Sequence, residues 1–277
     1  MNTSLIPMAA LIRDTFREAF ARRIFWGFAG CCTALLIFLI FIMRIDVVAG
    51  ALATVMIFGR AMPTTDVQGL VQQTQSVIAM ALYFFGMALS VFASAGLVAS
   101  VFEPGRIELL LSKPVSRTGI LLGRYLGNLL VVAANIVYLT LGSWIIFGIK
   151  TGVWGTGFLL SSVFTIFVFA VLLAVIVLIG VLWESAAVAI MATFGIMIIT
   201  PILAQRATIE RLLSSDWSRD MVRILYYVLP KTSDISVIIR HLILNQPVDS
   251  WMPVWSTALF GAVILGAGIL HFRRRSF

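Results

Sequence analysis

Six long runs of uncharged residues restrict the fold of this chain more than any other feature. Each run has 19 or more residues and contains no Asp, Glu, Lys or Arg. A membrane-spanning helix needs about 20 apolar residues, and a charge at its centre costs about 2.5–3.5 kcal/mol on insertion scales. The runs therefore predict six membrane-spanning helices. They comprise residues 24–43, 77–102, 125–149, 157–183, 186–204 and 251–270.

The composition agrees with a bilayer as the main solvent. Of the 277 residues, 61% are hydrophobic and 12% are charged, whereas soluble domains carry about 25% charged residues. Cys31 and Cys32 are neighbours inside the first run, which indicates packing rather than a disulfide framework. We expect an all-α polytopic membrane protein in which residues 24–277 form one six-span domain.

The segment before the first run, residues 1–23, has the pattern of an amphipathic helix. Asp14 and Glu18 face away from an apolar arc that arginines flank. We expect this interfacial helix to lie in the inner headgroup layer; a chance pattern in a frayed terminus is the alternative. The two acidic residues and the lack of an A-x-A site argue against a cleavable signal peptide. The apolar positions are Leu5, Ile12, Phe16, Ala19, Phe20 and Ile24.

Two segments between the runs are apolar but too short to span. Residues 47–59 are predicted to be interfacial or re-entrant, because 13 apolar residues do not make an ordinary span. The long loop 205–250 contains apolar patches at 221–229 and 235–244, which Pro230 separates. We expect two short helices there that cap the outer mouth of the bundle, or else a loose surface loop.

The distribution of charge predicts the orientation. With six spans and both termini inside, the inside segments carry 11 basic and 5 acidic residues, and the outside segments carry 9 and 7. Basic residues favour the cytoplasmic side, so we expect a multi-pass protein of the plasma (inner) membrane with both termini cytoplasmic. The net charge of +8 is then explained by membrane lipids and by orientation rather than by nucleic acid.

The inside segment 103–117, between the second and third runs, contains a compact helix. Pro104 and Gly105 end the second span, and residues 106–112 can make two helical turns with an apolar ridge and a charge on another face. Such a helix suits docking into a groove on a soluble partner. A plain connector between neighbouring spans is the alternative.

This segment resembles the permease subunits of ABC-2 type transporters. Similarity extends to residues 15–19 and 22–26, to residues 121–127 and to residues 226–230. Arg106-Ile107 departs from the family pattern, in which a Thr more often follows the glycine, and this puts a partner-facing role for Arg106 in question. The matching string is Glu103-x-Gly105-x-x-Glu108-Leu109-Leu110-Leu111-Ser112-x-Pro114-Val115-Ser116-Arg117.

The resemblance implies that this segment is a coupling helix that contacts a separate ATP-binding subunit. It also implies a second permease copy, as a homo- or heterodimer, and an exporter. The residues that take the coupling role by similarity are Glu103, Gly105, Arg106, Glu108, Leu111, Pro114 and Arg117.

No motif for nucleotide hydrolysis or other catalysis occurs in the chain. A Walker A loop needs Gly-Lys-Ser/Thr, but the only lysines, Lys113, Lys150 and Lys231, follow Ser, Ile and Pro. With two histidines, His241 and His271, a zinc H-E-x-x-H site cannot form. We therefore expect no catalytic residues, metal or cofactor, and we expect ATP to be hydrolysed on the partner chain.

A secondary carrier or channel that works without an ATPase is the alternative function. Such proteins usually place charged residues at mid-membrane, and none of the six runs contains one. The same absence favours an apolar or amphipathic cargo over a bare ion. A small-residue stripe, Gly86, Ser90 and Ser94, has four-residue spacing and predicts either a dimer interface or packing within one bundle.

Overall fold

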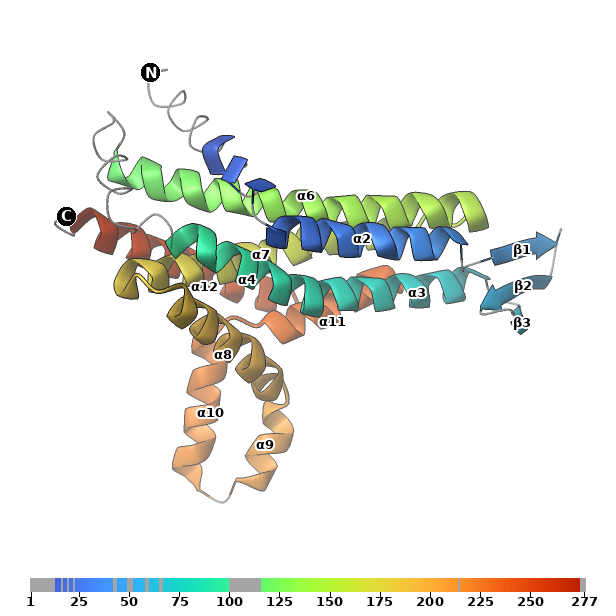
Figure 1. Ribbon diagram of the computed structural model, residues 1–277. Helices are drawn as coiled ribbons and strands as arrows, with labels where there is room; N and C mark the ends of the chain where they lie inside the picture. Colours follow the sequence, from blue (N-terminus) through green and yellow to red (C-terminus); the bar gives the residue numbers. More distant parts are fainter. Residues whose placement is uncertain are drawn as a thin grey trace, which may run out of the picture.

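The protein is a bundle of long helices, seen here in a computed structural model (Figure 1). The structure describes residues 13–15, 17–18, 20–21, 23–41, 44–48, 52–57, 60–64, 67–99, 116–213 and 215–274. The long helices are α2 (Arg23–Phe41), α3 (Val67–Ala81) continued by the π-helix η1 (Leu82–Gly86) and α4 (Met87–Ala99), α6 (Arg117–Thr151), α7 (Thr156–Trp183), α8 (Ala186–Ala204) and α12 (Met252–Arg274).

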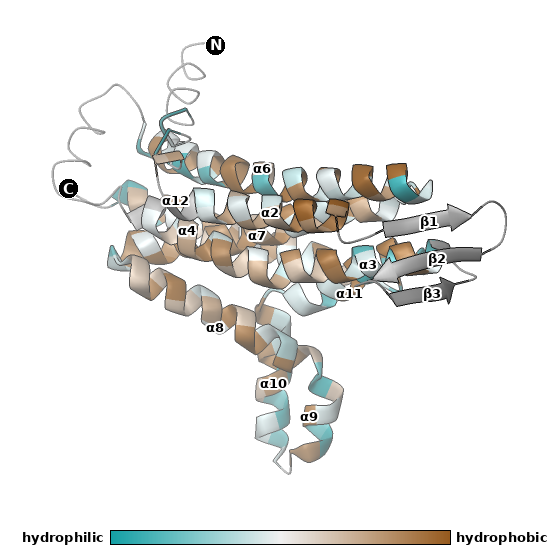
Figure 2. Cartoon of the chain, turned by 45° about the vertical axis from the view of Figure 1, so that its right-hand side comes forward, coloured by the Kyte–Doolittle hydropathy of each residue, from teal (hydrophilic) through white to brown (hydrophobic). Residues whose placement is uncertain are grey.

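Five of these helical stretches are long and apolar enough to cross a membrane, judged by length and composition. A sixth, Trp26–Phe41 within α2, is apolar but shorter. The predicted membrane fold is thus confirmed, and the predicted number of spans agrees roughly. Apolar residues predominate along α4 and α8 in Figure 2, and more hydrophilic ones appear on the helices outside the bundle.

Helix α7 is the centre of the bundle. It packs against α4, α6, α8, α11 (Thr232–Ile243) and α12. Its middle turns are apolar on every side, as a helix surrounded by other helices must be. Side chains that are at most 1% exposed there include Val168, Phe169, Leu172, Leu173, Ile176 and Val177.

A small antiparallel sheet follows α2, at the end of the bundle opposite to the start of α6 (Figure 1). Its strands β1 (Arg44–Val48), β2 (Leu52–Ile57) and β3 (Arg60–Thr64) pair in sequence order. The apolar run 47–59 predicts an interfacial or re-entrant segment, and strands are not among the structures predicted for it. Short connections let neighbouring strands satisfy each other's backbone groups, and the β-branched residues of β2 favour this conformation. The bundle itself is all-α, and the sheet is an addition to it.

The described residues of the long loop, 205–213 and 215–250, form three helices, of which one lies along the bundle. Helices α9 (Arg206–Leu212) and α10 (Asp216–Val228) form a hairpin that projects away from the bundle (Figure 1). Helix α11 returns and packs against α3, α7 and α8. The two predicted apolar patches are helical, but α10 does not cap the bundle.

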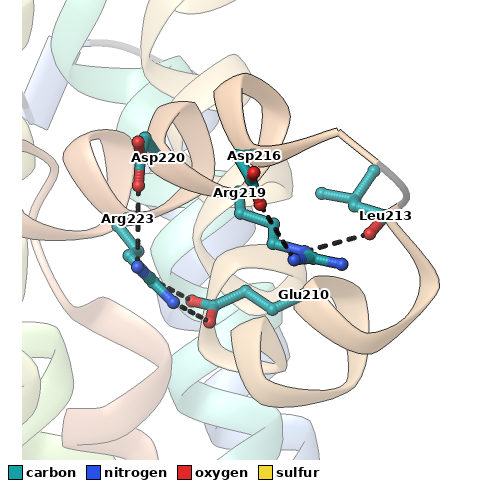
Figure 3. A network of polar contacts seen from close by, with 6 residues as sticks. All are labelled: Glu210, Leu213, Asp216, Arg219, Asp220 and Arg223. Carbon is teal, nitrogen blue, oxygen red and sulfur yellow. Dashed lines mark hydrogen bonds and ion pairs between the residues drawn. The ribbon is translucent and has the colours of Figure 1, made fainter.

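Within the hairpin, polar side chains of α10 reach α9 and the residue that follows it (Figure 3). Arg223 binds both carboxylate oxygens of Glu210 at 3.0 and 3.2 Å, and Arg219 reaches Asp216 at 3.0 Å. Apolar side chains of α10, including Trp217 and Ile224, are exposed instead. The pair of Arg223 with Glu210, and a hydrogen bond that Arg219 Nε donates to the Leu213 carbonyl oxygen at 3.0 Å, join α10 to α9 and its end.

Candidate functional site

Helix α6 begins at the end of the predicted coupling segment. Arg117 is its first residue, and the hydroxyl of Ser116 caps it by accepting from the backbone N–H of Gly119 at 3.1 Å. The helix has 35 residues, so it is about 52 Å long. It therefore runs without a break from this segment to the end of the bundle that carries the sheet (Figure 1). The other six predicted coupling residues lie outside the described residues: Glu103, Gly105, Arg106, Glu108, Leu111 and Pro114.

The described part of the N-terminal segment lies on α6, where Arg124 binds it. Arg124 is 3% exposed. Its Nη1 donates to Glu18 Oε2 at 2.5 Å, and its Nη2 donates to Asp14 Oδ2 at 3.3 Å. Thr15, between these two acidic residues, is fully buried. The acidic face of this segment, which the sequence predicts to lie opposite the apolar arc, therefore faces α6.

The role of Arg124 as a partner of this segment was not predicted from the sequence. Two signals pointed to it: Asp14 and Glu18 are four residues apart and so share one helix face, and Arg124 directly precedes an uncharged run. A cation at the edge of a span, beside a doubly acidic helix face, is a candidate ion-pair partner. Neither signal alone specifies the pair, because 106 residues separate Glu18 from Arg124.

One turn further along α6, Asn128 binds the second span. Ser94 Oγ and Asn128 Oδ1 are 3.1 Å apart, and the Asn128 amide donates to the Ser94 carbonyl oxygen at 3.4 Å. Both side chains are buried. Adjacent turns of α6 therefore hold the N-terminal segment and α4, which is the helix that leads into the predicted coupling segment.

The predicted small-residue stripe belongs to this contact between helices of one chain. Gly86 is buried, Ser90 is 1% exposed and Ser94 is fully buried. The Ser90 hydroxyl donates to the Gly86 carbonyl oxygen at 2.7 Å, which satisfies it within its own helix. In this structure the three residues offer no exposed surface to a second copy.

The second span changes its helical form halfway along. Residues Leu82–Gly86 form a π-helix, and such insertions often mark functional positions. Tyr83 in this turn donates to the carbonyl oxygen of Thr232 at 2.6 Å, and the hydroxyl of Thr232 lies 2.6 Å from that of Thr200 on α8. The π-helix is thereby tied to the start of α11 and to α8.

A cavity of about 570 Å³ opens beside the π-helix, between α3 and α11. Phe84 and Phe85, which follow Tyr83, are exposed at one part of its wall, and Arg240 of α11 lies at another. Its volume lies in the range of small-molecule sites, roughly 300–1,000 Å³. The lining residues are Gln73, Ser76, Val77, Met80, Ala81, Phe84, Phe85, Ser236, Val237, Arg240 and Leu244.

A polar cluster joins the hairpin to α11. The Tyr226 hydroxyl donates to Asp234 Oδ2 at 2.7 Å, and the Arg206 guanidinium lies 3.9 Å from the Tyr226 ring centre. Burial, and then the bond to Asp234, raises the pKa of Tyr226 to about 12. Burial lowers the pKa of Lys231, whose ammonium lies 4.7 Å from the same ring centre. These contacts position the hairpin relative to the bundle and show no catalytic arrangement.

Within the described part of the chain, no three side chains of His, Cys, Asp or Glu come together as a metal site would require. The model of a family described as ABC-2 family transporter protein matches residues 9–277. No curated protein sequence matches the chain.

Proposed function

Because this chain belongs to the ABC-2 transporter family and is thus the membrane subunit of an ABC transporter, we propose that a separate ATP-binding subunit drives it. The observation that carries the proposal is the family match, which extends over nearly the whole chain. A transport subunit of this kind is not itself an enzyme, and the sequence contains no Walker A loop. The proposed direction of transport is export.

The proposed docking site of the ATPase is the coupling segment, in which Glu108 and Leu111 are two of the residues that take the coupling role by similarity. Arg117 at the start of α6 and the end of α4 flank this segment. A push on the segment would therefore reach the second and third spans directly. Asn128 would keep α4 and α6 together as they tilt, and Arg124 would move the N-terminal helix with them. The coupling segment and the N-terminal helix would then move as one unit.

We place the coupling segment and both termini in the cytoplasm, in the plasma (inner) membrane. The start of α6 and the C-terminal end of α12 lie at the same end of the bundle in Figure 1. That end of α12 carries Arg273 and Arg274. Basic residues beside a span favour the cytoplasmic side, so the arrangement supports this orientation.

The transport path is proposed to form between two permease copies. In one chain, α8 and α12 leave much apolar surface exposed, for example Met191, Leu259 and Val263. Lipid covers part of such a surface and a second copy can cover another part. Alternating tilt of the spans at that interface would expose the path first inside and then outside.

The experiment that tests the proposal is a double substitution, Glu108→Ala with Leu111→Ala, in the complex purified with its ATPase. We expect the complex to lose most of the ATPase stimulation that transport substrate or the permease produces. The matched control removes a leucine and an acidic residue from the hairpin, with Leu212→Ala and Asp216→Ala, and should keep it. Normal coupling in the first variant would contradict the assignment, as would gradient-driven uptake by this chain alone.

A further inference from the structure

We propose that the cavity between α3, the π-helix and α11 binds an amphiphile with one anionic group and one extended apolar chain. This inference rests on the proposed function, because it names the class of molecule that the transporter handles. It is drawn from the distribution of polar and apolar residues along the cavity wall.

The cavity is elongated along the second span. Its wall follows that span from Gln73 to Phe85, a distance of about 18 Å at the rise of a helix. Only one face of α3 and one face of α11 contribute to it, and side chains such as Val77 and Phe85 remain exposed at its rim. An extended chain fits this shape better than a compact solute does.

One end of the cavity is apolar and aromatic. Met80, Ala81, Phe84 and Phe85 line it from the second span. Phe85 is 75% exposed and Phe84 is 44% exposed, although both belong to a helix whose other residues, such as Tyr83, are buried. The π-helix adds a residue to the turn and so directs two phenylalanines to this side. Such a surface binds an apolar chain by burial of area.

The other end carries the one cationic side chain among the described lining residues, although Leu244, one helical turn beyond it on α11, is apolar. Arg240, an exposed residue, lines the cavity together with Gln73 and Ser76. No ion pair joins Arg240 to any acidic group among the described residues. An arginine fork binds carboxylate, sulfate or phosphate oxygens with two parallel hydrogen bonds. The amide and the hydroxyl can donate to the same group.

Contacts around the cavity show that these two ends are separated in space. Thr232, at the start of α11, touches Tyr83 of the π-helix. The other end of α11 lies against the start of α7, where Leu242 contacts Gly157. Two residues before Gly157, Gly155 lies close to Gln75 of α3. Helix α11 therefore runs antiparallel to α3, so that Arg240 lies towards Gln73 and Gln75 and away from Phe84 and Phe85.

This separation favours an amphiphile over the other candidate occupants. A small anion would gain only from one exposed arginine, and a neutral lipid chain would leave that arginine unpaired. A second copy of the chain would need to offer an acidic residue to Arg240 and an apolar one to Phe85 at the correct spacing. A single-headed anionic amphiphile satisfies both ends at once.

The test uses the chain alone in nanodiscs of phosphatidylcholine, without ATP or ATPase. The probe is a 16-carbon fatty acid with a photoreactive diazirine in mid-chain, and its methyl ester is the uncharged matched probe. We expect the acid to label peptides that contain residues 73–85 and 236–244. We expect Arg240→Gln to raise the acid concentration that gives half-saturated labelling about tenfold, as loss of one charge-assisted contact does. For the ester, the same substitution should change the concentration at half-saturated labelling less than twofold.

Two further variants complete the design. Arg211→Gln removes an exposed arginine of α9 outside the cavity and should bind both probes as the native chain does. Ala81→Trp fills the cavity and should weaken both probes about tenfold or more; Val77→Trp, at an exposed rim position, serves the same purpose if Ala81→Trp does not fold. A native size-exclusion profile is required of every variant.

Several outcomes would overturn the inference. They are equal binding of acid and ester by the native chain, unchanged binding of the acid by Arg240→Gln, and labelling outside the two peptides. A disulfide between two copies through Val77→Cys would assign the cavity to a dimer interface and would also overturn it. Phosphatidylglycerol added to the nanodisc distinguishes two possible sources of the bound amphiphile. Competition with the acid probe identifies a bilayer lipid as the occupant, and lack of competition identifies a single-chain substrate.

The inference and the proposed function can fail separately. If probe binding fails while Glu108→Ala with Leu111→Ala still uncouples the ATPase, only the cavity assignment is wrong. If the probe binds as expected while that variant couples normally, the proposed coupling is wrong and the binding site stands.

Discussion

Gly127 on α6 lies so close to Thr15 that a Cβ atom added to the glycine would be 2.7 Å from the Cβ of the threonine. Thr15 is fully buried there, one turn along α6 from the ion pairs of Arg124. The N-terminal segment is therefore held against the third span by close packing and by charge. A side chain at position 127 would separate the two elements.

Gly127→Ala is expected to loosen the N-terminal segment by about 1–3 kcal/mol, the usual effect of overpacking. Hydrogen exchange of residues 13–21 should rise, and the thermal midpoint of the purified protein should fall. Gly195→Ala on α8 is the matched control, because a Cβ there meets no atom within 4 Å and alanine favours a helix. Equal behaviour of the two variants would show that the contact with Thr15 is unimportant.

Arg124→Gln removes the cation that binds Glu18 and Asp14. Breaking a buried ion pair costs several kcal/mol, and Asp14 is more than half exposed, so we expect a loss of about 2–3 kcal/mol. Protease cleavage within residues 1–23 measures the release of the segment. The exchanged pair, Arg124→Glu with Glu18→Arg, should restore part of the protection. No recovery in that double variant would count against a direct charge interaction.

Gly157→Ala is expected to displace α11, because a Cβ at this position would overlap the backbone carbonyl of Leu242. Since backbone atoms cannot move aside as a flexible side chain can, the destabilisation should reach about 3 kcal/mol. The fall in the thermal midpoint measures this destabilisation. Labelling of the cavity by the photoreactive fatty acid should become weaker in the same variant. Gly266→Ala on α12, where the added Cβ meets nothing within 4 Å, should be tolerated. A native thermal midpoint for Gly157→Ala would be incompatible with this packing.

Tyr226 should make the protein less stable at alkaline pH. Its pKa is about 12 in the folded protein and about 10 in an unfolded chain. Between these values the unfolded chain loses the proton and the folded protein keeps it, so stability falls as the pH rises. Tyr226→Phe should show a smaller decrease in thermal midpoint between pH 9 and pH 12. Tyr227→Phe, at a 59% exposed position, should keep the native dependence, and identical curves for all three proteins would refute the assignment.

The proposed orientation places residue 113 in the cytoplasm. In a variant that lacks Cys31 and Cys32, a cysteine introduced by Lys113→Cys should resist an impermeant maleimide added to intact cells. Permeabilised cells should label fully. Asp216→Cys on the projecting hairpin should label in intact cells. Reaction of position 113 from outside would reverse the orientation and remove the access that the ATPase needs.

The sequence predicted the helices of the bundle well and their contacts poorly. The uncharged runs led to α6, α7, α8 and α12 because periodicity and apolar length are local properties. The strands at 44–64 were missed because a short apolar run is compatible with several structures. The projection of α10 was missed because it depends on which element receives the polar face, and that element is α9, through Glu210.

What the sequence by itself determined is the class of structure: a bilayer excludes charge and demands paired backbone groups, so long uncharged runs must become spanning helices. The family signature added the expected role of residues 103–117. Only the tertiary structure decided that Glu18 lies on Arg124 and that Arg240 and Phe85 line one cavity. Such pairs join residues far apart in the chain, where no local period specifies them and only the packing of whole helices brings them together.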